Sequence, residues 1–433
     1  MSSMRASAVM FTARGAQILP DAIGAAVHAQ GTSGQTSNLE GTGTTILVHP
    51  WTRCEMTAKT LTDMRGVLKR MAAEIDVLPA VGGATEDYEQ PHAEEVWEHA
   101  ISHDEVIFDA IYEREPSGKH PPLYRAVTPL PRTQEHLFRY FLDGSFRSYF
   151  LGTILEHDRE SPVHFAQIGA CAVRRENDGT MRREGSEVRP FLFVGKQRVS
   201  EKIWRDFEHL TSEYGITLVD LTERDIGIRV FEEIDLRSRA TGRVRFEMHN
   251  LEASLISQVF PKLRQDAWLI VDGSLLFQPT LSAMGESEGQ KPVIGVAKNF
   301  RKDPQFVYGH GPRAERRSVY RLLADLEFAH RTAAFSSSHG RVSFWYVRIH
   351  EQEHMDYPVM GVVKVELPNP GLEPPSSELV NKLSCALMAE GRVTPHGLDP
   401  RWHAHIYPIF LAERCIKESL LGWDVVQRYL RWR

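Results

Sequence analysis

The chain has 433 residues, 42% of them hydrophobic and 25% charged, with a formal net charge of −6. These values are ordinary for a soluble globular protein of roughly two or three domains. No apolar run approaches the ~20 residues that span a bilayer, and the N-terminus lacks a signal-peptide pattern. We therefore expect a cytoplasmic protein without membrane association. Neither a zinc knuckle nor a disulfide framework is indicated, because the cysteines lie far apart and form no CxxC pair: Cys54, Cys171, Cys385 and Cys415.

Basic residues concentrate in one segment, from Lys291 to Arg321, although the chain as a whole is acidic. The segment holds eight basic and two acidic residues, which gives +6 and leaves −12 for the remainder. Such a segment fits a localised contact with phosphates. The alternative is a solvated helix face with scattered arginines. The basic residues are Lys291, Lys298, Arg301, Lys302, Arg313, Arg316, Arg317 and Arg321.

The first 125 residues form an N-terminal extension that we expect to be partly flexible and helical. Residues 1 to about 50 are rich in Gly, Ser, Thr and Ala, which is typical of flexible chain. Apolar residues at helical spacing predict helices over 57–75 and 92–112. Five prolines between Pro116 and Pro131 indicate a linker. We place the main domain at 126–433.

The main domain begins with apolar residues that alternate with a period of two. Strands are predicted over 137–153, 162–175 and 188–194, with turn residues between them, so they should form an antiparallel meander. A helix over 202–214, a short strand over 216–221 and a long helix over 235–263 follow. Further strands are predicted over 267–271, 291–300, 343–350 and 359–367. Helices over 376–390 and from Ile406 complete the chain.

Two stretches run from apolar residues straight into Asp-Gly-Ser, at Asp143 and at Asp272. This pattern predicts a buried strand that ends at a carboxylate and then turns sharply. Two strand-end carboxylates could supply oxygen ligands to a hard divalent cation. The alternative is ordinary turn chemistry, since Asp, Gly and Ser all favour turns.

A third carboxylate, Glu252, falls inside the apolar arc of the long helix. A carboxylate in that position is costly unless it has a partner. A cation shared with Asp143 and Asp272 would be such a partner. A salt-bridged or snorkelling side chain at the edge of the stripe is the alternative.

The order of these motifs resembles that of the NurA nucleases, which work with the HerA hexameric ATPase in processing DNA ends. The resemblance covers about residues 135–420 and rests on the order and spacing of DGS, a helix-borne Glu, DGSL, VIGVAKN, WYVRI, VKVELP and YPIFLAE. It implies an α/β fold with an RNase H-like mixed sheet flanked by helices. It also implies a homodimer that cleaves DNA with Mn²⁺ (or Mg²⁺) and a HerA-type ATPase as partner.

The resemblance also assigns roles to residues. Asp143, Glu252 and Asp272 match the catalytic, metal-binding carboxylates, and Lys298 matches a basic catalytic residue. The family's last ligand lies on the C-terminal helix after a Tyr-Pro pair, where this chain has Glu413 in place of the expected His. His403 and His405 lie upstream, so Glu413 or His405 would be the fourth metal ligand.

Phosphodiester hydrolysis needs an activated water and a stabilised leaving oxygen, which two metals held by carboxylates can provide. A lysine nearby can neutralise charge on the phosphoryl group. The chain contains no GxxxxGK[ST] motif, so motor power must come from a partner. Two alternatives remain: a catalytically silent dimeric DNA-binding adaptor of the ATPase, and an RNase H-like nuclease on RNA or hybrids. The residues expected to contact DNA are Lys298, Arg301, Lys302, Arg313, Arg316 and Arg317.

Overall fold

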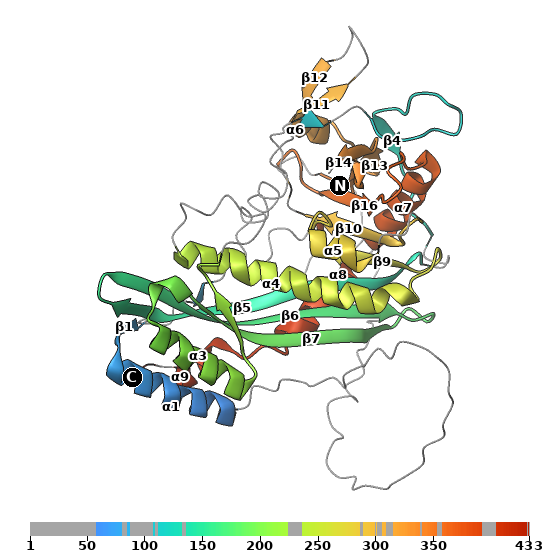
Figure 1. Ribbon diagram of the computed structural model, residues 1–433. Coiled ribbons are helices and arrows are strands. Elements are labelled where there is room, and N and C mark those ends of the chain that lie inside the picture. Colours follow the sequence, from blue (N-terminus) through green and yellow to red (C-terminus); the bar gives the residue numbers. More distant parts are fainter. Residues whose placement is uncertain are drawn as a thin grey trace, which may run out of the picture.

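The computed structural model shows an α/β protein built on one large mixed sheet (Figure 1). The order along the main path of this sheet is β4-β13-β15-β16-β10-β9-β5-β6-β7-β8, and β1, β2 and β14 pair beside it. A small second sheet has the order β12-β11-β3. The structure describes residues 58–79, 85–86, 107–108, 111–131, 136–223, 236–285, 289–298, 300, 305–308, 315–337, 340–352, 357–391, 404–430 and 432.

The strands vary widely in length, and the longest three lie next to one another. Their bounds are β1 Asp76–Pro79, β2 Thr85–Glu86, β3 Ile107–Phe108, β4 Tyr124–Ala126, β5 Phe138–Glu156, β6 Arg159–Arg175, β7 Met181–Val194, β8 Thr217–Asp220, β9 Trp268–Asp272, β10 Val293–Ala297, β11 Gln305–Tyr308, β12 Glu315–Ser318, β13 His330–Thr332, β14 Phe335–Ser337, β15 Val342–Arg348 and β16 Val362–Pro368.

Helices cover both faces of the long strands. One face carries α4, and the other carries α8 at one end and α1, α3 and α9 at the other (Figure 1). The helical bounds are α1 Ala58–Glu74, η1 Lys196–Arg198, α3 Glu201–Tyr214, α4 Leu236–Val259, η3 Phe260–Lys262, α5 Gln278–Ala283, α6 Val319–Ala324, α7 Ser377–Glu390, α8 Tyr407–Lys417 and α9 Trp423–Tyr429.

The predicted antiparallel meander is confirmed as β5, β6 and β7, but its first strand does not end at Asp143. Strand β5 continues through Gly144 and Ser145 to Glu156. The reason is pairing, because β6 runs beside β5 over almost its whole length, with a single irregularity between Phe150 and Gly152. The first Asp-Gly-Ser is therefore part of a strand, and its prediction as a turn was wrong.

The second Asp-Gly-Ser behaves as predicted. Strand β9 ends at Asp272, and Gly273 has a φ of +94°, which only glycine adopts readily. Strand β9 is parallel to both β5 and β10. The sheet therefore loses a strand beside the middle of β5, at the level of the two Asp residues.

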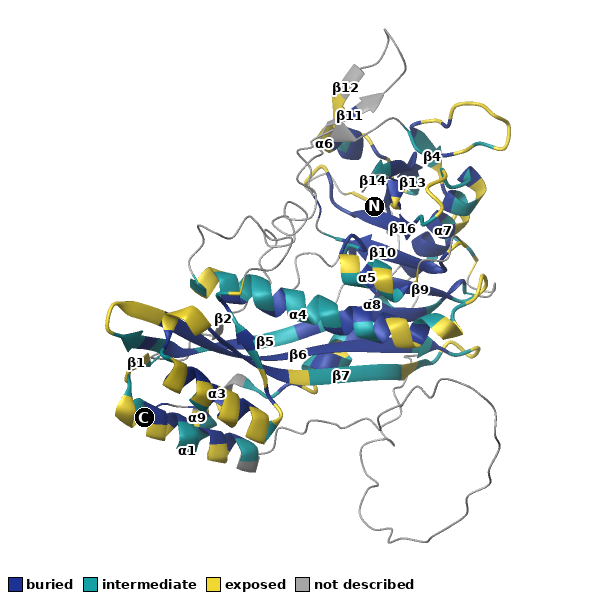
Figure 2. Ribbon diagram, in the orientation of Figure 1, coloured by how far each residue is buried: buried dark blue, intermediate teal, exposed yellow. Residues whose placement is uncertain are grey.

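Apolar burial explains the layers (Figure 2). Even-numbered residues of β6, such as Ile168 and Ala170, pack with Leu255 and Ile256 of α4. The odd-numbered Cys171 packs on the α8 side. This alternation is the period of two expected for a strand buried on both faces.

Most of the predicted helices match observed ones, with one exception. Residues 107–108 lie in β3, which pairs with β11, so the predicted helix over 92–112 is wrong there; residues 92–106 lie outside the described part. Helices α5, α6 and α9 were not predicted. Strands β1 and β4 both join the large sheet, so residues on each side of position 125 contribute to it. Within the described part of the chain, none of the helices combines the length and apolarity needed to cross a bilayer.

Candidate active site

Asp143 and Asp272 lie next to each other on neighbouring strands. Leu142 and Val271 are register partners in the parallel pair of β5 and β9, and each Asp is the next residue. Adjacent strands lie about 4.8 Å apart, and residues at the same level of a parallel pair point to the same face. Asp143 is buried, with 7% of its surface exposed. Its Oδ1 accepts a hydrogen bond of 2.8 Å from the backbone N–H of Gly144.

Helix α8 covers this face of the sheet. Ile409, Ala412 and Ile416 of α8 belong to the same core cluster as Phe141 of β5 and Ile270 of β9. Phe141 lies two residues before Asp143, and Ile270 two residues before Asp272, so both Asp residues face α8. The helix begins with Pro408 in its first turn, where the missing N–H of proline costs no hydrogen bond.

Glu413 is the carboxylate that α8 brings to this face. Its side chain is 30% exposed and forms an ion pair of 2.8 Å with Lys417, one turn further along the helix. The solvated pair considered from the sequence is thus present. The same carboxylate is also close enough to Asp143 to act on its pKa.

Glu252 approaches β5 at Gly144, from the face of the sheet opposite to Asp143. A Cβ added to Gly144 would lie only 2.4 Å from Glu252 Oε1 and 2.8 Å from Met248 Cγ. Only glycine therefore leaves room for the carboxylate of Glu252 on β5. His249 Nδ1 lies 2.7 Å from Glu252 Oε2 and holds the carboxylate from the side. His249 was not predicted, and its position one turn before Glu252 is the only signal that could have found it.

Lys298 is the positively charged side chain of the site. Its Nζ donates to Asp272 Oδ2 at 2.8 Å, and the two side chains are 12% and 22% exposed. Lys298 directly follows β10, the parallel neighbour of β9, so the two residues meet where both strands end. An ion pair this sheltered is screened less by salt than a surface pair.

Three other carboxylates act on Asp143, and the four acidic residues Asp143, Asp272, Glu413 and Glu252 are here termed the carboxylate cluster. Burial raises the pKa of Asp143 well above its ordinary value, and the negative charges of Asp272, Glu413 and Glu252 raise it further. Lys298 opposes this rise. Like charges held together in a low dielectric disfavour ionisation, and strongly perturbed groups of this kind mark functional sites more often than structural ones.

The donor chemistry of the carboxylate cluster fits a hard divalent cation, because all four side chains offer oxygen. The side chains are not closed into a ligand shell: among the described residues, no three or more His, Cys, Asp or Glu side chains are placed to hold a metal ion. Two features account for this. Glu252 comes from the opposite face, and Lys298 takes one oxygen of Asp272.

For the other predicted site residues, the structure either shows a position outside the carboxylate cluster or does not describe one. His405 is half-buried just before α8, and it is not among the main influences on the pKa of Asp143. Arg316 and Arg317 lie on β12, which pairs with β11. Lys291 is buried, with its Nζ over the ring of Phe260, so the basic segment does not form a single exposed face. Arg301, Lys302, Arg313 and His403 lie outside the described residues.

A second buried ion pair, which was not predicted, supports the turn after Asp272. Lys364 lies 2.8 Å from Glu366 on β16. Glu366 Oε2 accepts hydrogen bonds from Ser274 Oγ and from the backbone N–H of Leu275. The charged residues alternating with valine in VKVEL could have signalled it, because alternate residues of a strand share a face.

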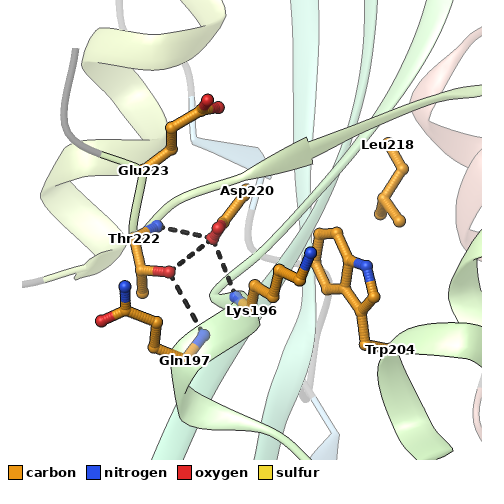
Figure 3. Close-up of a pocket in the computed structure, with 7 residues that line it drawn as sticks. All are labelled: Lys196, Gln197, Trp204, Leu218, Asp220, Thr222 and Glu223. Carbon is orange, nitrogen blue, oxygen red and sulfur yellow. Dashed lines mark hydrogen bonds between the residues drawn. The ribbon is translucent and has the colours of Figure 1, made fainter. Parts of the chain in front are cut away.

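A cavity of about 520 Å³ lies elsewhere, where β7 and β8 end (Figure 3). Asp220 Oδ1 accepts from the backbone N–H groups of Lys196 and Thr222 and from Thr222 Oγ1, so it serves the loop itself. Lys196 Nζ lies over the ring of Trp204. This cavity shares no residue with the carboxylate cluster.

Neither the known protein-family models nor the curated proteins provide a match to this sequence. The geometry of the site and the resemblance of its motifs therefore carry the functional proposal.

Proposed function

We propose that the protein is a metal-dependent deoxyribonuclease that processes DNA as a homodimer together with a HerA-type hexameric ATPase. The observation that carries the proposal is Asp143, a buried carboxylate whose pKa is raised by burial and by three other carboxylates. Keeping such a carboxylate ionised lowers the stability of the folded protein, and a divalent cation bound among the carboxylates would compensate its charge. Manganese or magnesium would suit oxygen ligands of this kind.

The fold supports the same proposal. Three antiparallel strands, with two parallel strands added to the first of them, are compatible with the RNase H-like core that the resemblance implies. The candidate residues lie where β9 and β10 end and on the two helices that cover opposite faces there.

In this proposal, Asp143, Asp272, Glu252 and Glu413 would hold Mn²⁺ or Mg²⁺, which when bound supplies an activated water and stabilises the leaving oxygen. Lys298 can turn from Asp272 toward a phosphate and neutralise the charge that develops on it. His249 fixes the orientation of Glu252 through the contact at its Nδ1. Because Asp143 is buried, its own electrostatic interactions are stronger than they would be in water.

A second candidate function is a catalytically silent DNA-binding adaptor of the ATPase. The observation that favours it is the open arrangement of the carboxylate cluster among the described residues, in which Lys298 already neutralises Asp272. Cleavage of RNA or of RNA–DNA hybrids would be the outcome if the substrate assignment is wrong.

The proposal is tested by digestion of end-labelled DNA, RNA and hybrid duplexes with Mn²⁺, Mg²⁺ or EDTA, with and without the ATPase. We expect cleavage of DNA that requires a divalent metal. Binding of DNA without cleavage under every metal condition would favour the adaptor, and cleavage confined to RNA or hybrids would correct the substrate.

Glu413 rather than His405 is expected to be the fourth ligand, because it is the residue of α8 that acts on Asp143. Glu413→Gln should raise the Mn²⁺ concentration needed for half-maximal cleavage by about 10-fold or more, a loss of affinity typical of disturbing a metal site. His405→Ala should leave it unchanged. Metal titrations of both variants measure this, and wild-type Mn²⁺ dependence in Glu413→Gln would leave three protein ligands.

Neutralising Arg313, Arg316 and Arg317 should weaken DNA binding if these residues contact phosphates. The slope of log affinity against log salt should flatten by up to about 0.9 for each phosphate that is no longer neutralised. Binding measured across a salt series tests this. The matched control is Arg205→Gln, because Arg205 is exposed on α3 and pairs with Glu201. An unchanged slope in the triple variant would assign the basic segment to ordinary solvation.

A further inference from the structure

The turn that follows Asp272 lies across β10 on the α4 side of the sheet. Gly273 donates its backbone N–H to the carbonyl oxygen of Val296 on β10 at 3.0 Å. A Cβ added to Gly295 would meet the carbonyl oxygen of Gly273 at 2.8 Å and Leu275 Cγ at 2.7 Å. Leu275 belongs to the same core cluster as the buried residues of α4. The turn therefore packs directly on β10, in the space that the glycine leaves.

Glu366 holds this turn from the next strand, β16. It is the register partner of Gly295 across β10 and β16. Its Oε2 accepts hydrogen bonds from Ser274 Oγ at 2.9 Å and from the backbone N–H of Leu275 at 2.7 Å. Its Oε1 lies 2.8 Å from Lys364 Nζ, and the two side chains are 0% and 7% exposed. Lys364 compensates the buried charge, and hydrogen bonds to a charged acceptor are the stronger ones.

The segment that begins at Asp272 ends at Phe277, which contacts α4. The ring centroids of Phe277 and His249 are 5.5 Å apart, and those of Phe277 and Phe246 are 5.4 Å apart, with the latter rings nearly perpendicular. His249 Nδ1 in turn lies 2.7 Å from Glu252 Oε2. One short segment thus connects Asp272, which faces α8, with the contact that holds Glu252 on the α4 side.

We propose that Glu366 is a positioning residue that sets Asp272 and Glu252 together through this segment. Asp272 is the last residue of β9, so the chain after it depends on the bonds of the turn. Glu366 fixes the start of the segment, and the far end sets His249 and thereby Glu252. Ligands of a metal must be held to within about 0.5 Å of their productive positions. The inference rests on the proposed function, which makes both carboxylates metal ligands.

The test replaces the ion pair by two neutral pairs that differ only at position 366. Lys364→Met with Glu366→Gln keeps an amide oxygen that can accept the hydrogen bonds of the turn, whereas Lys364→Met with Glu366→Met keeps no such acceptor. Exchange of a buried ion pair for residues of similar volume is often neutral for stability. Mn²⁺ binding to the full chain is measured from the electron paramagnetic resonance of the free ion. We expect nearly wild-type affinity for the Gln pair and a loss of about 10-fold or more for the Met pair.

Ser274→Ala tests the same anchor without changing the ion pair. It removes one hydrogen bond to Glu366, and Ser274→Thr restores the hydroxyl. Alanine should weaken Mn²⁺ binding by about 10-fold, and threonine should recover it. The matched control is Ser384→Ala on α7, which removes the acceptor of the buried Trp345 Nε1. The control should lower the thermal unfolding midpoint and leave Mn²⁺ binding unchanged, which separates positioning from stability.

Phe277→Leu tests the far end of the segment, because it removes the ring that contacts His249. It should also weaken Mn²⁺ binding. Combined with Ser274→Ala, the loss should be smaller than the product of the two single losses, since residues that act through one segment are not additive. A loss equal to the full product would overturn the link between the two ligands.

The remaining outcomes separate this inference from the proposed function. Wild-type Mn²⁺ binding in both the Met pair and Ser274→Ala would overturn the positioning role, and so would an equal loss in the Gln and Met pairs. If the wild type binds Mn²⁺ but cleaves no nucleic acid, the proposed nuclease fails, and the binding measurements still decide the role of Glu366. If the wild type binds no Mn²⁺, both proposals fail.

Discussion

Asparagine in place of Asp143 should reduce metal-dependent cleavage by at least about 10³-fold, because loss of a single charge-stabilising group already costs 10²–10³ in rate. Asparagine has nearly the same shape as aspartate, and its carbonyl can still accept the hydrogen bond from the backbone N–H of Gly144. The variant therefore removes the charge and keeps the fold. Single-turnover cleavage with saturating Mn²⁺ measures the loss.

The same substitution should stabilise the protein in the absence of metal. The folded-state pKa of Asp143 lies above its ordinary value of 3.8, so the folded protein binds this proton more tightly than the unfolded chain. Stability then falls as the pH rises from the ordinary pKa through the folded-state pKa. Asp143→Asn lacks this loss, so its advantage in unfolding midpoint should be absent in acid and grow as the pH rises through that window. Thermal unfolding with EDTA across a pH series measures the difference.

Adding Mn²⁺ should reverse the order of the two proteins. A cation that binds only the folded state stabilises it by about 2.7 kcal/mol at 100 times its dissociation constant. We expect that gain for the wild type and little of it for Asp143→Asn. The control is Asp178→Asn, at an exposed turn where Asp178 accepts hydrogen bonds from Thr180. Equal cleavage by Asp143→Asn and the wild type would remove Asp143 from the active site.

Much of the secondary structure could be predicted because the period of the apolar residues changes clearly along the chain. The alternation over 162–175 and the helical spacing from Val244 to Val259 correspond to β6 and α4. The strand at β3 could not be predicted in this way. Its two residues are fixed by pairing with β11, almost two hundred positions later, and such a partner leaves no local pattern.

The candidate site was predictable as a set of residues but not as a geometry. Both Asp residues were found from apolar runs that end in Asp-Gly-Ser, and the structure places them side by side. Yet β5 does not end at Asp143, because a strand ends only where pairing stops, and β6 continues beside it. The approach of Glu252 from the opposite face was also hidden, since it depends on the missing side chain of Gly144.

Gly144 is therefore expected to be needed for full cleavage, although it has no chemistry of its own. Alanine at this position would place Cβ 2.4 Å from Glu252 Oε1 and 2.8 Å from Met248 Cγ, so both side chains must move. Overpacking of this kind costs about 1–3 kcal/mol in stability. Displacing a metal ligand without removing it should lower cleavage by about 10²-fold, in line with the loss from a misplaced reacting group.

Gly144→Ala separates the position of Glu252 from its presence, which no substitution of Glu252 itself can do. The matched control is Gly289→Ala, because a Cβ there meets no atom within 4 Å. Cleavage and Mn²⁺ titrations are measured for both variants at a temperature where chemical unfolding shows each to be folded. If Gly144→Ala loses stability but cleaves DNA like the wild type with the same Mn²⁺ dependence, Glu252 is a structural residue of α4. If it binds Mn²⁺ more weakly while Gly289→Ala does not, the carboxylate reaches the site through the space that this glycine leaves in β5.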